Sequence, residues 1–189
     1  MNATIVSVGG GGYDVANKVR QSGLFAGAAF LSCDTDKTAL KEYTNADKHF
    51  LFVKCYEKEE TNVKDLFEQT GNTIILCATL GGLTGSTHAP IVAREAQRTG
   101  KFVCSLFTMP FEFEGEKRNQ RAEAALSKLI SGSNHSIQQN NDSLRKVRNG
   151  KCTLYDFMED QSLIEKLKLM LDRIEICQER WMLKRTGLA

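Results

Sequence analysis

Two glycine-rich stretches, Val8-Gly9-Gly10-Gly11-Gly12 and Gly81-Gly82-Leu83-Thr84-Gly85, decide the fold of this chain. Each follows an apolar run typical of a buried strand, Ala3–Val8 or Thr73–Cys77, and each precedes a helical pattern. Glycine lets the backbone turn through positive φ and approach a ligand closely, so that N–H groups at a helix start converge on an anion. Two such stretches predict a cradle for a polyphosphate. The alternative is that the glycines only make tight turns.

Along the rest of the chain, apolar runs alternate with helical patterns. We expect the other strands at Ala28–Ser32, Phe50–Val53 and Phe102–Phe107. Helices are expected at Tyr13–Ser22, Thr61–Gln69, Thr84–Arg98 and Glu116–Ile130. Near-continuous apolar strands alternating with helices indicate a parallel sheet covered on both faces. The prediction is an α/β, Rossmann-like doubly wound fold with a mostly parallel sheet.

The last part of the chain predicts one long amphipathic helix, from about 153 to 184. Apolar residues recur there at spacings of three, four or seven, which places them on one stripe; they are Phe157, Ile164, Leu167, Leu171, Ile174 and Trp181. We expect residues 1–189 to form a single domain, with this helix packed on the sheet and no second, C-terminal domain.

Composition excludes several classes of protein. The 189 residues are 41% hydrophobic and 25% charged, with a net charge of +2 that is too small to suggest nucleic acid or an anionic membrane as the main partner. No apolar run approaches 20 residues, and the N-terminus lacks a signal-peptide layout, so we expect a cytoplasmic protein. The six cysteines form no C-x-x-C pair and are expected to be buried, reduced thiols.

The residues present exclude other known binding motifs. No G-x-x-x-x-G-K-[ST] P-loop occurs in the sequence. A dinucleotide fingerprint starting at Gly9 would need its third glycine at the position of Asp14. His88 is expected on a helix surface, and His49 and His135 show no metal-ligand spacing, so no protein metal site is predicted.

Several segments together resemble one family. The stretch Gly81-Gly82-Leu83-Thr84-Gly85-Ser86-Thr87 is similar to the tubulin signature G-G-G-T-G-[ST]-G. Thr108-Met109-Pro110-Phe111-Glu112-Phe113-Glu114-Gly115 is similar to the T-x-P-F-x-F-E-G stretch of FtsZ. The first glycine stretch, Asp34-Thr35-Asp36 and Asn141-Asp142-Ser143-Leu144 resemble further FtsZ segments in the same order. The chain is identified as a truncated, divergent member of the FtsZ/tubulin family, limited to the N-terminal GTPase domain.

The resemblance implies a site for GTP or GDP, and leaves open whether Mg²⁺ accompanies the nucleotide. The nucleotide-binding residues it implies are Gly9, Gly10, Gly11, Asp34, Gly81, Gly82, Leu83, Thr84, Gly85, Ser86, Glu114, Arg118, Asn141, Phe157 and Gln161. Glu114 would accept from the ribose, and Phe157 would stack on the base. Gln161 stands where the family has Asp or Asn, which softens the preference for guanine. Phe157 could instead be a core residue, and Glu114 and Arg118 a surface pair.

Departures from the family pattern bear on catalysis. Tyr13-Asp14 adds bulk and negative charge after the first glycines, and Leu83 and Thr87 replace signature glycines. The stretch that resembles the γ-phosphate loop by position, Lys54–Glu60, has acids and no glycine. Arg185–Ala189 contains no carboxylate side chain to serve as the family's catalytic acidic loop. We expect a degenerate GTPase with no catalytic residues and little or no hydrolysis by itself.

Two hypotheses about function follow. The first is a bacterial, cytoskeletal or cell-division protein that binds guanine nucleotide and acts through self-association or as a modulator of an FtsZ-like partner. The second is a nucleotide-free scaffold that keeps only the fold. The glycine pattern argues against a third class, a nucleotide-using oxidoreductase. A cavity bounded by Gly10, Gly82 and Glu114 would favour the first hypothesis, whereas Tyr13 or Leu83 filling that space would favour the second.

Overall fold

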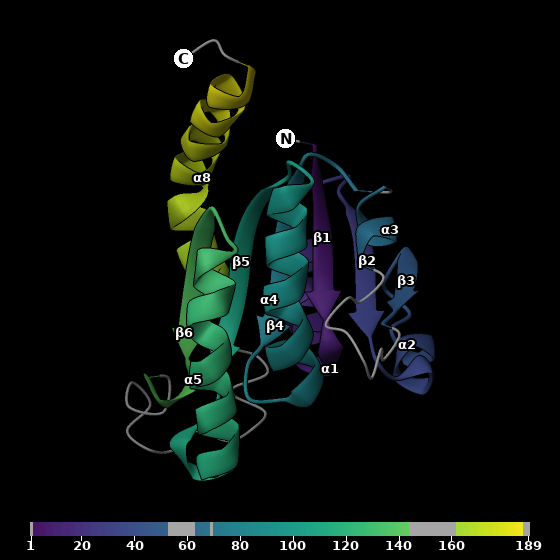
Figure 1. Cartoon of the computed structure of the whole chain (residues 1–189), viewed down its shortest axis with the longest axis vertical. Coiled ribbons are helices and arrows are strands. Elements are labelled where there is room, and N and C mark those ends of the chain that lie inside the picture. Colours follow the sequence, from purple (N-terminus) through teal and green to yellow (C-terminus); the bar gives the residue numbers. More distant parts are fainter. Residues whose placement is uncertain (1, 53–62, 69, 144–161, 187–189) are drawn as a thin grey trace.

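Six parallel strands form one sheet at the centre of the molecule (Figure 1). The computed structural model describes residues 2–52, 63–68, 70–143 and 162–186. The spatial order is β3-β2-β1-β4-β5-β6, and every pair is parallel. The bounds are β1 Ala3–Val8, β2 Ala29–Asp34, β3 Lys48–Leu51, β4 Thr73–Thr79, β5 Phe102–Met109 and β6 His135–Asn140.

Helices cover both faces of the sheet, which confirms the predicted Rossmann-like, doubly wound class (Figure 1). Residues of α1 (Gly9–Gln21) and α8 (Ser162–Thr186) pack in the core on one face. The other face is covered by α3 (Lys64–Phe67), α4 (Leu83–Arg98) and α5 (Glu116–Ser131). A short α2, Lys37–Glu42, follows β2, and a 3-10 turn, η1, spans Glu112–Glu114.

The central strands are apolar along their whole length because both of their faces are buried. In β4, Ile74 faces one core and its neighbour Ile75 faces the other, and both are fully buried. β1 lies between β2 and β4, with Val8 opposite Ala78. The segments that leave β1 and β4 therefore emerge side by side at the carboxyl edge of the sheet, where open α/β sheets bind ligands.

Some elements differ from the sequence prediction. β6 was not predicted, because its sequence is largely polar and it lies at the edge of the sheet. The six-residue α2 was also missed. The expected strand Phe50–Val53 is described two residues earlier, as Lys48–Leu51, and the expected helix Thr61–Gln69 is described only as Lys64–Phe67. The first helix begins at Gly9 rather than Tyr13, so the glycines form its first turn.

The long C-terminal helix is described from Ser162 to Thr186. Its predicted stripe is buried at Ile164, Leu167 and Ile174, and the Trp181 ring packs edge-on against Phe102 at 6.0 Å. Residues 153–161 of the expected helix lie outside the described residues. In the part of the chain that the structure describes, no helix has the length and apolar character needed to span a membrane.

Two expectations about exposure were wrong. His88 is buried, because its ring stacks on Phe52 at 4.4 Å instead of facing solvent. Among the cysteines, Cys33, Cys77 and Cys104 are free and buried as expected, but Cys177 is exposed on α8. Cys55 and Cys152 lie outside the described residues.

Candidate functional site

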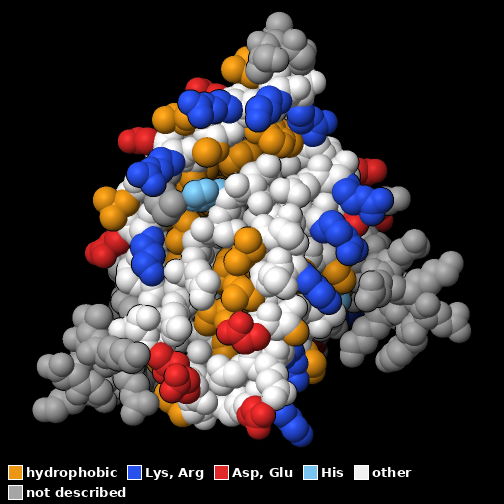
Figure 2. All heavy atoms as spheres, turned by 60° about the vertical axis from the view of Figure 1, so that its left-hand side comes forward, with side chains coloured by type: hydrophobic (Ala, Val, Ile, Leu, Met, Phe, Trp, Pro, Cys, Tyr) orange, Lys and Arg blue, Asp and Glu red, His pale blue; other side chains and the backbone are white. Residues whose placement is uncertain are grey.

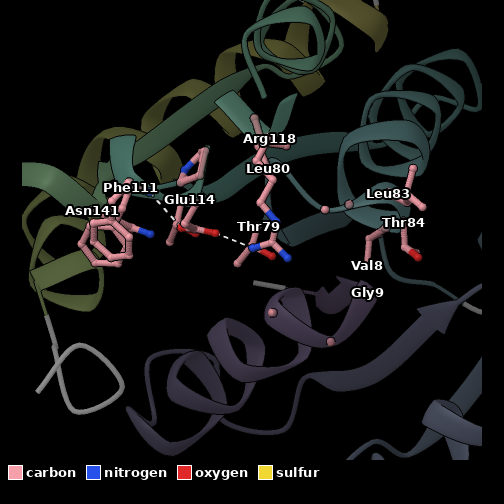
Figure 3. A pocket seen from close by; sticks show the side chains of 17 residues that line it. Val8, Gly9, Thr79, Leu80, Leu83, Thr84, Phe111, Glu114, Arg118 and Asn141 are labelled. Atoms are coloured by element: carbon pink, nitrogen blue, oxygen red, sulfur yellow. Dashed lines mark hydrogen bonds and ion pairs between the residues drawn. The ribbon is translucent and has the colours of Figure 1, made fainter. Parts of the chain in front are cut away.

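A cavity of about 520 Å³ opens at the carboxyl edge of the sheet, where α1 and α4 begin (Figure 3). Its walls come from the ends of β1, β4 and β5, the segments that follow them, and the residue that follows β6. The lining residues are Val8, Gly9, Gly10, Gly11, Thr79, Leu80, Gly82, Leu83, Thr84, Gly85, Thr108, Pro110, Phe111, Phe113, Glu114, Arg118 and Asn141. The cavity therefore includes Gly10, Gly82 and Glu114, the three residues expected to bound it.

Two helix N-termini meet at this cavity. The N-cap residues, Val8 of α1 and Gly82 of α4, provide no side-chain hydrogen bond to their helices, and neither first turn contains an acid. The first N–H groups of a helix have no partner within the helix and carry partial positive charge. Uncapped starts that face one cavity are therefore suited to an anion such as a phosphate.

The glycines differ in what their packing requires. A Cβ on Gly11 would lie 2.2 Å from Thr79 Oγ1, and a Cβ on Gly85 would lie 2.2 Å from the Thr79 carbonyl oxygen. These glycines let α1 and α4 pack closely against the end of β4. A Cβ on Gly82 would meet no atom within 4 Å, and the φ of Gly82 is −73°. Packing thus accounts for Gly11 and Gly85 without a ligand, but it gives no reason for glycine at position 82.

Glu114 and Arg118 form an ion pair at the cavity (Figure 3). Glu114 Oε2 accepts from the Arg118 guanidinium, and Oε1 accepts from the Phe111 backbone N–H at 2.9 Å. These two are the only charged side chains among the described residues that line the cavity. The surface pair considered from sequence is therefore present, and together with the Phe111 N–H it engages both carboxylate oxygens of Glu114.

Asn141 contributes a buried acceptor. It is 5% exposed, lines the cavity, and its Oδ1 has no hydrogen-bond partner among the described residues. Leaving such a group unsatisfied costs about 1–3 kcal/mol. A ligand that donates a hydrogen bond at this end of the cavity would remove that cost.

Asp34 lies behind the cavity wall rather than in it. Its carboxylate accepts from the Thr35 N–H at 2.7 Å, the Tyr43 hydroxyl at 2.7 Å and the Thr84 hydroxyl at 3.4 Å. Burial, together with the bond to Asp34, raises the pKa of Tyr43. In this structure the hydrogen bond from Thr84 to Asp34 connects the end of β2 to the start of α4, and Asp34 thus supports the cavity indirectly.

Ser86 and Gly81 have a similar supporting role. The Gly81 N–H donates to Ser86 Oγ at 2.8 Å, and Arg121 donates to the Gly81 carbonyl oxygen at 2.7 Å. Neither Gly81 nor Ser86 lines the cavity. These bonds set the shape of the turn between β4 and α4.

The two bulky departures do not close the cavity. Tyr13 is 9% exposed and points into the core, where its ring stacks on Tyr43 at 4.3 Å. Its hydroxyl accepts from the Asn45 N–H at 3.0 Å, and neither Tyr13 nor Asp14 lines the cavity. Leu83 does line it but is 71% exposed, so it stands at the rim. The scaffold hypothesis required Tyr13 or Leu83 to fill the cavity, and neither residue does so.

Part of the expected site cannot be placed. Phe157, Gln161 and the 54–60 segment lie outside the described residues. Sequence reasoning also missed several wall residues, among them Thr79, Thr108 and Phe111. Their position at or just after the ends of β4 and β5 was the available signal. Within the described ranges, no group of three or more His, Cys, Asp or Glu could hold a metal ion.

The fold and the cavity together define a class of protein. It is a doubly wound α/β domain whose cavity, at the ends of β1 and β4, is suited to binding an anion. The sequence model of the Tubulin/FtsZ family, GTPase domain, matches residues 53–149. The chain therefore belongs to the Tubulin/FtsZ family.

Individual relatives agree with this assignment. The cell division protein FtsZ of Aquifex aeolicus is 26% identical over 179 residues, covering 86% of this chain and 48% of that protein. Cell division protein FtsZ 1 of Archaeoglobus fulgidus is 31% identical over 160 residues, covering 76% and 43%. The chain spans about half the length of the curated relatives it matches.

Solved structures show the same fold. An empty FtsZ dimer from M. jannaschii superposes with a TM-score of 0.74 at 24% identity, covering 88% of this chain and 53% of that one. The CetZ2 protofilament from Haloferax volcanii, bound to GTPγS, gives 0.66 at 18% identity, covering 100% and 60%. At these identities the likeness concerns the fold.

Proposed function

We propose that this chain binds a guanine nucleotide, GTP or GDP, in the cavity at the starts of α1 and α4. The observation that carries the proposal is the convergence of two uncapped helix N-termini on one cavity, which Gly82 lines. Membership of the family supports it. A solved CetZ1 from Haloferax volcanii is a GDP-bound monomer, and CetZ2 is bound to GTPγS.

The described residues fit such a ligand. The polyphosphate would lie against the first turns of α1 and α4, where backbone N–H groups are available. Arg118 would add a positive charge, and Asn141 Oδ1 would accept from the sugar or the base. A volume of about 520 Å³ lies within the range common for small-molecule sites, about 300–1,000 Å³.

We further propose that these 189 residues hydrolyse little or no GTP by themselves. Phosphoryl transfer to water needs a group that orients the nucleophile. Glu114 is the only carboxylate among the described lining residues, and both of its oxygens are already held by Arg118 and the Phe111 N–H. A turnover rate equal to that of an active family member at matched concentration would contradict this part of the proposal.

The nucleotide site is tested by replacing Gly82, where no atom stands in the way of a side chain. Asp and Asn are both good N-cap residues and differ chiefly in charge. Gly82→Asp is expected to keep the fold and to weaken nucleotide binding at least tenfold, because its carboxylate would face the phosphates. Gly82→Asn is the matched control and is expected to retain most of the affinity.

Calorimetric titration with GTP, GDP and ATP, with and without Mg²⁺, gives the readout. Binding of a guanine nucleotide that Gly82→Asp weakens at least tenfold and Gly82→Asn largely keeps would support the proposal. No binding of any of the three nucleotides would contradict it and favour the nucleotide-free scaffold. One observation favours that alternative, since Glu114 and Asp34 have their carboxylates satisfied without a ligand.

At the level of the cell, we propose a cytoplasmic protein that acts in cell division through self-association or by modulating an FtsZ-like partner. The FtsZ relatives are named as cell division proteins, and the CetZ2 structure is a protofilament. Co-sedimentation with a polymerising family member, with and without GTP, tests this. A chain that remains in the supernatant and leaves the polymer unchanged would argue against the modulator role.

A further inference from the structure

Asp34 lies behind the point where the starts of α1 and α4 meet. Its Oδ1 accepts from the hydroxyl of Thr84, in the first turn of α4, at 3.4 Å. Its Oδ2 accepts from the Tyr43 hydroxyl at 2.7 Å, and that hydroxyl oxygen would lie 3.3 Å from a Cβ on Gly10, in the first turn of α1. Gly10 and Thr84 both line the cavity. The Asp34 carboxylate is therefore one hydroxyl group away from each of the two walls that the phosphates would contact.

In the part of the chain that the structure describes, the Asp34 carboxylate has only neutral hydrogen-bond partners. They are the N–H groups of Thr35 and Asp36 and the hydroxyls of Thr35, Tyr43 and Thr84. All of them can donate, which suits an ionised carboxylate, a group that only accepts. Because Asp34 is 5% exposed, water and salt screen its negative charge poorly. A phosphate at either helix start would therefore be repelled by Asp34.

The described residues supply little positive charge to offset Asp34. Each helix start provides roughly half a positive elementary charge, so one carboxylate offsets about as much as the two starts provide together. Arg118, the only cation among the described lining residues, is already paired with Glu114. On the face shown in Figure 2, Lys and Arg side chains lie mainly above the lower end of the molecule, where the carboxyl edge is, and Asp and Glu side chains lie among them at that end.

The repulsion by Asp34 is strongest at one end of a bound nucleotide. Asn141, with its unpartnered Oδ1, and Thr84 lie at opposite ends of the cavity in Figure 3. A nucleotide whose sugar or base contacts Asn141 therefore directs its terminal phosphate toward Thr84 and the carboxylate behind it. Repulsion between like charges falls with distance, so Asp34 acts on a third phosphate more than on a second.

We propose that Asp34 makes this site bind GDP in preference to GTP. The inference rests on the proposed nucleotide site and identifies the ligand that the site favours. GDP carries one negative charge fewer than GTP, and its last phosphate stays further from Thr84. Asp34 is thus a residue that determines specificity through its charge, without contacting the base or the sugar.

A purely structural role of Asp34 would have a different signature. If Asp34 only connected β2 to α4, its loss would weaken the binding of GMP, GDP and GTP alike. An effect of its charge instead grows with the number of phosphates on the ligand. The ratio between the affinities for GDP and GTP therefore distinguishes the two roles.

Asp34→Asn tests the proposal, because it removes the charge and keeps an oxygen that can accept from the Thr35 N–H, as Asp34 Oδ1 does at 2.7 Å. Affinities for GMP, GDP and GTP are measured by calorimetric titration without divalent cations. The unaltered chain should bind GDP at least about fivefold more tightly than GTP, and Asp34→Asn should reduce that ratio to less than about twofold while changing GMP binding least. Asp36→Asn is the matched control: Asp36 is the exposed N-cap of α2, does not line the cavity, and Asn caps a helix equally well, so the ratio should not change.

Tyr43→Phe tests the same charge in the opposite direction. The ring can keep its stacking on Tyr13, but Asp34 Oδ2 loses its donor and the negative charge is less well balanced. The preference for GDP should therefore increase at least about twofold. Tyr13→Phe, which removes the hydroxyl that accepts from the Asn45 N–H, is the control and should leave the preference unchanged.

A preference for GDP that Asp34→Asn removes and Tyr43→Phe increases would support the proposal. An unaltered chain that binds GTP as tightly as GDP, an Asp34→Asn variant that keeps the preference, or variants that weaken all three nucleotides alike would each overturn it. If circular dichroism shows that Asp34→Asn does not fold, the unaltered chain and Tyr43→Phe decide the question. Absence of binding by both the unaltered chain and Asp34→Asn would overturn the proposed nucleotide site together with this inference, whereas equal binding of GDP and GTP would overturn the inference alone.

Discussion

Arg118, in the first turn of α5, forms an ion pair at the cavity with Glu114, the last residue of η1. The Arg118 side chain is 56% exposed, and exposed pairs of this kind contribute about 0–1 kcal/mol to stability. The pair therefore contributes little to the fold, while Arg118 is the only cation among the described lining residues. Its position points to a role toward a ligand.

Arg118→Ala is expected to lower the free energy of unfolding by less than about 1 kcal/mol and to weaken guanine-nucleotide binding about tenfold. Chemical denaturation and calorimetric titration measure the two effects. Arg98→Ala is the control, because Arg98 forms an exposed pair with Glu95 at 3.2 Å and does not line the cavity. Equal losses of affinity in both variants would show that Arg118 has no specific role.

The close contacts of Gly11 and Gly85 predict a stability difference between glycines. Gly11→Ala and Gly85→Ala each place a Cβ 2.2 Å from an atom of Thr79 and are expected to destabilise the protein by about 1–3 kcal/mol. Gly82→Asn has open space for its side chain and should change stability by less than about 0.5 kcal/mol. Thermal unfolding measures all three, and a Gly11→Ala variant as stable as the unaltered chain would contradict the packing argument.

The buried thiols predict selective modification. Burial raises the pKa of Cys104 to about 12 and also raises the pKa values of Cys33 and Cys77, so these thiols are protonated and shielded in the native protein. Cys177 is exposed. In a Cys55→Ser, Cys152→Ser background, a thiol reagent at pH 8 should modify Cys177 rapidly and the other three only after unfolding. Rapid modification of all four in the native state would be the contrary result.

Asp47 predicts a pH dependence of stability. Burial would raise the pKa of Asp47, but the Phe30 N–H bond at 2.8 Å and the Arg20 guanidinium at 3.1 Å outweigh it and lower that pKa. A carboxyl with a lowered folded-state pKa stabilises the protein above its unfolded pKa of about 3.9, and this contribution is lost as the pH falls below that value. Because the pair is exposed, we expect at most about 1 kcal/mol.

Asp47→Asn should therefore reduce stability at pH 7 and show a smaller loss between about pH 5 and 3 than the unaltered chain. Urea unfolding across that pH range provides the measurement. Glu123→Gln, which removes an exposed carboxylate on α5, serves as the control and should preserve the slope of the unaltered chain. An unchanged slope in Asp47→Asn would disprove the assignment.

The parts of the fold that could be read from sequence are those with a strong local pattern. β4 is buried on both faces, and its unbroken apolar run predicted a buried strand of a parallel sheet. β6 could not be predicted, because an edge strand with exposed polar side chains lacks both the apolar run and a clear alternation. The stripe of α8 was visible because Ile164, Leu167 and Ile174 repeat at helical spacing.

For the site, the sequence by itself determined the family and the place of the two glycine stretches, because strand, turn and helix signals are local and their order survives divergence. Only the tertiary structure decided the direction of individual side chains. In the folded chain Tyr13 lies in the core, Asp34 lies behind the cavity wall, and Gly82 lines the cavity. These outcomes depend on contacts between residues far apart in the chain, such as Tyr13 with Tyr43 and Asp34 with Thr84, which no local pattern encodes.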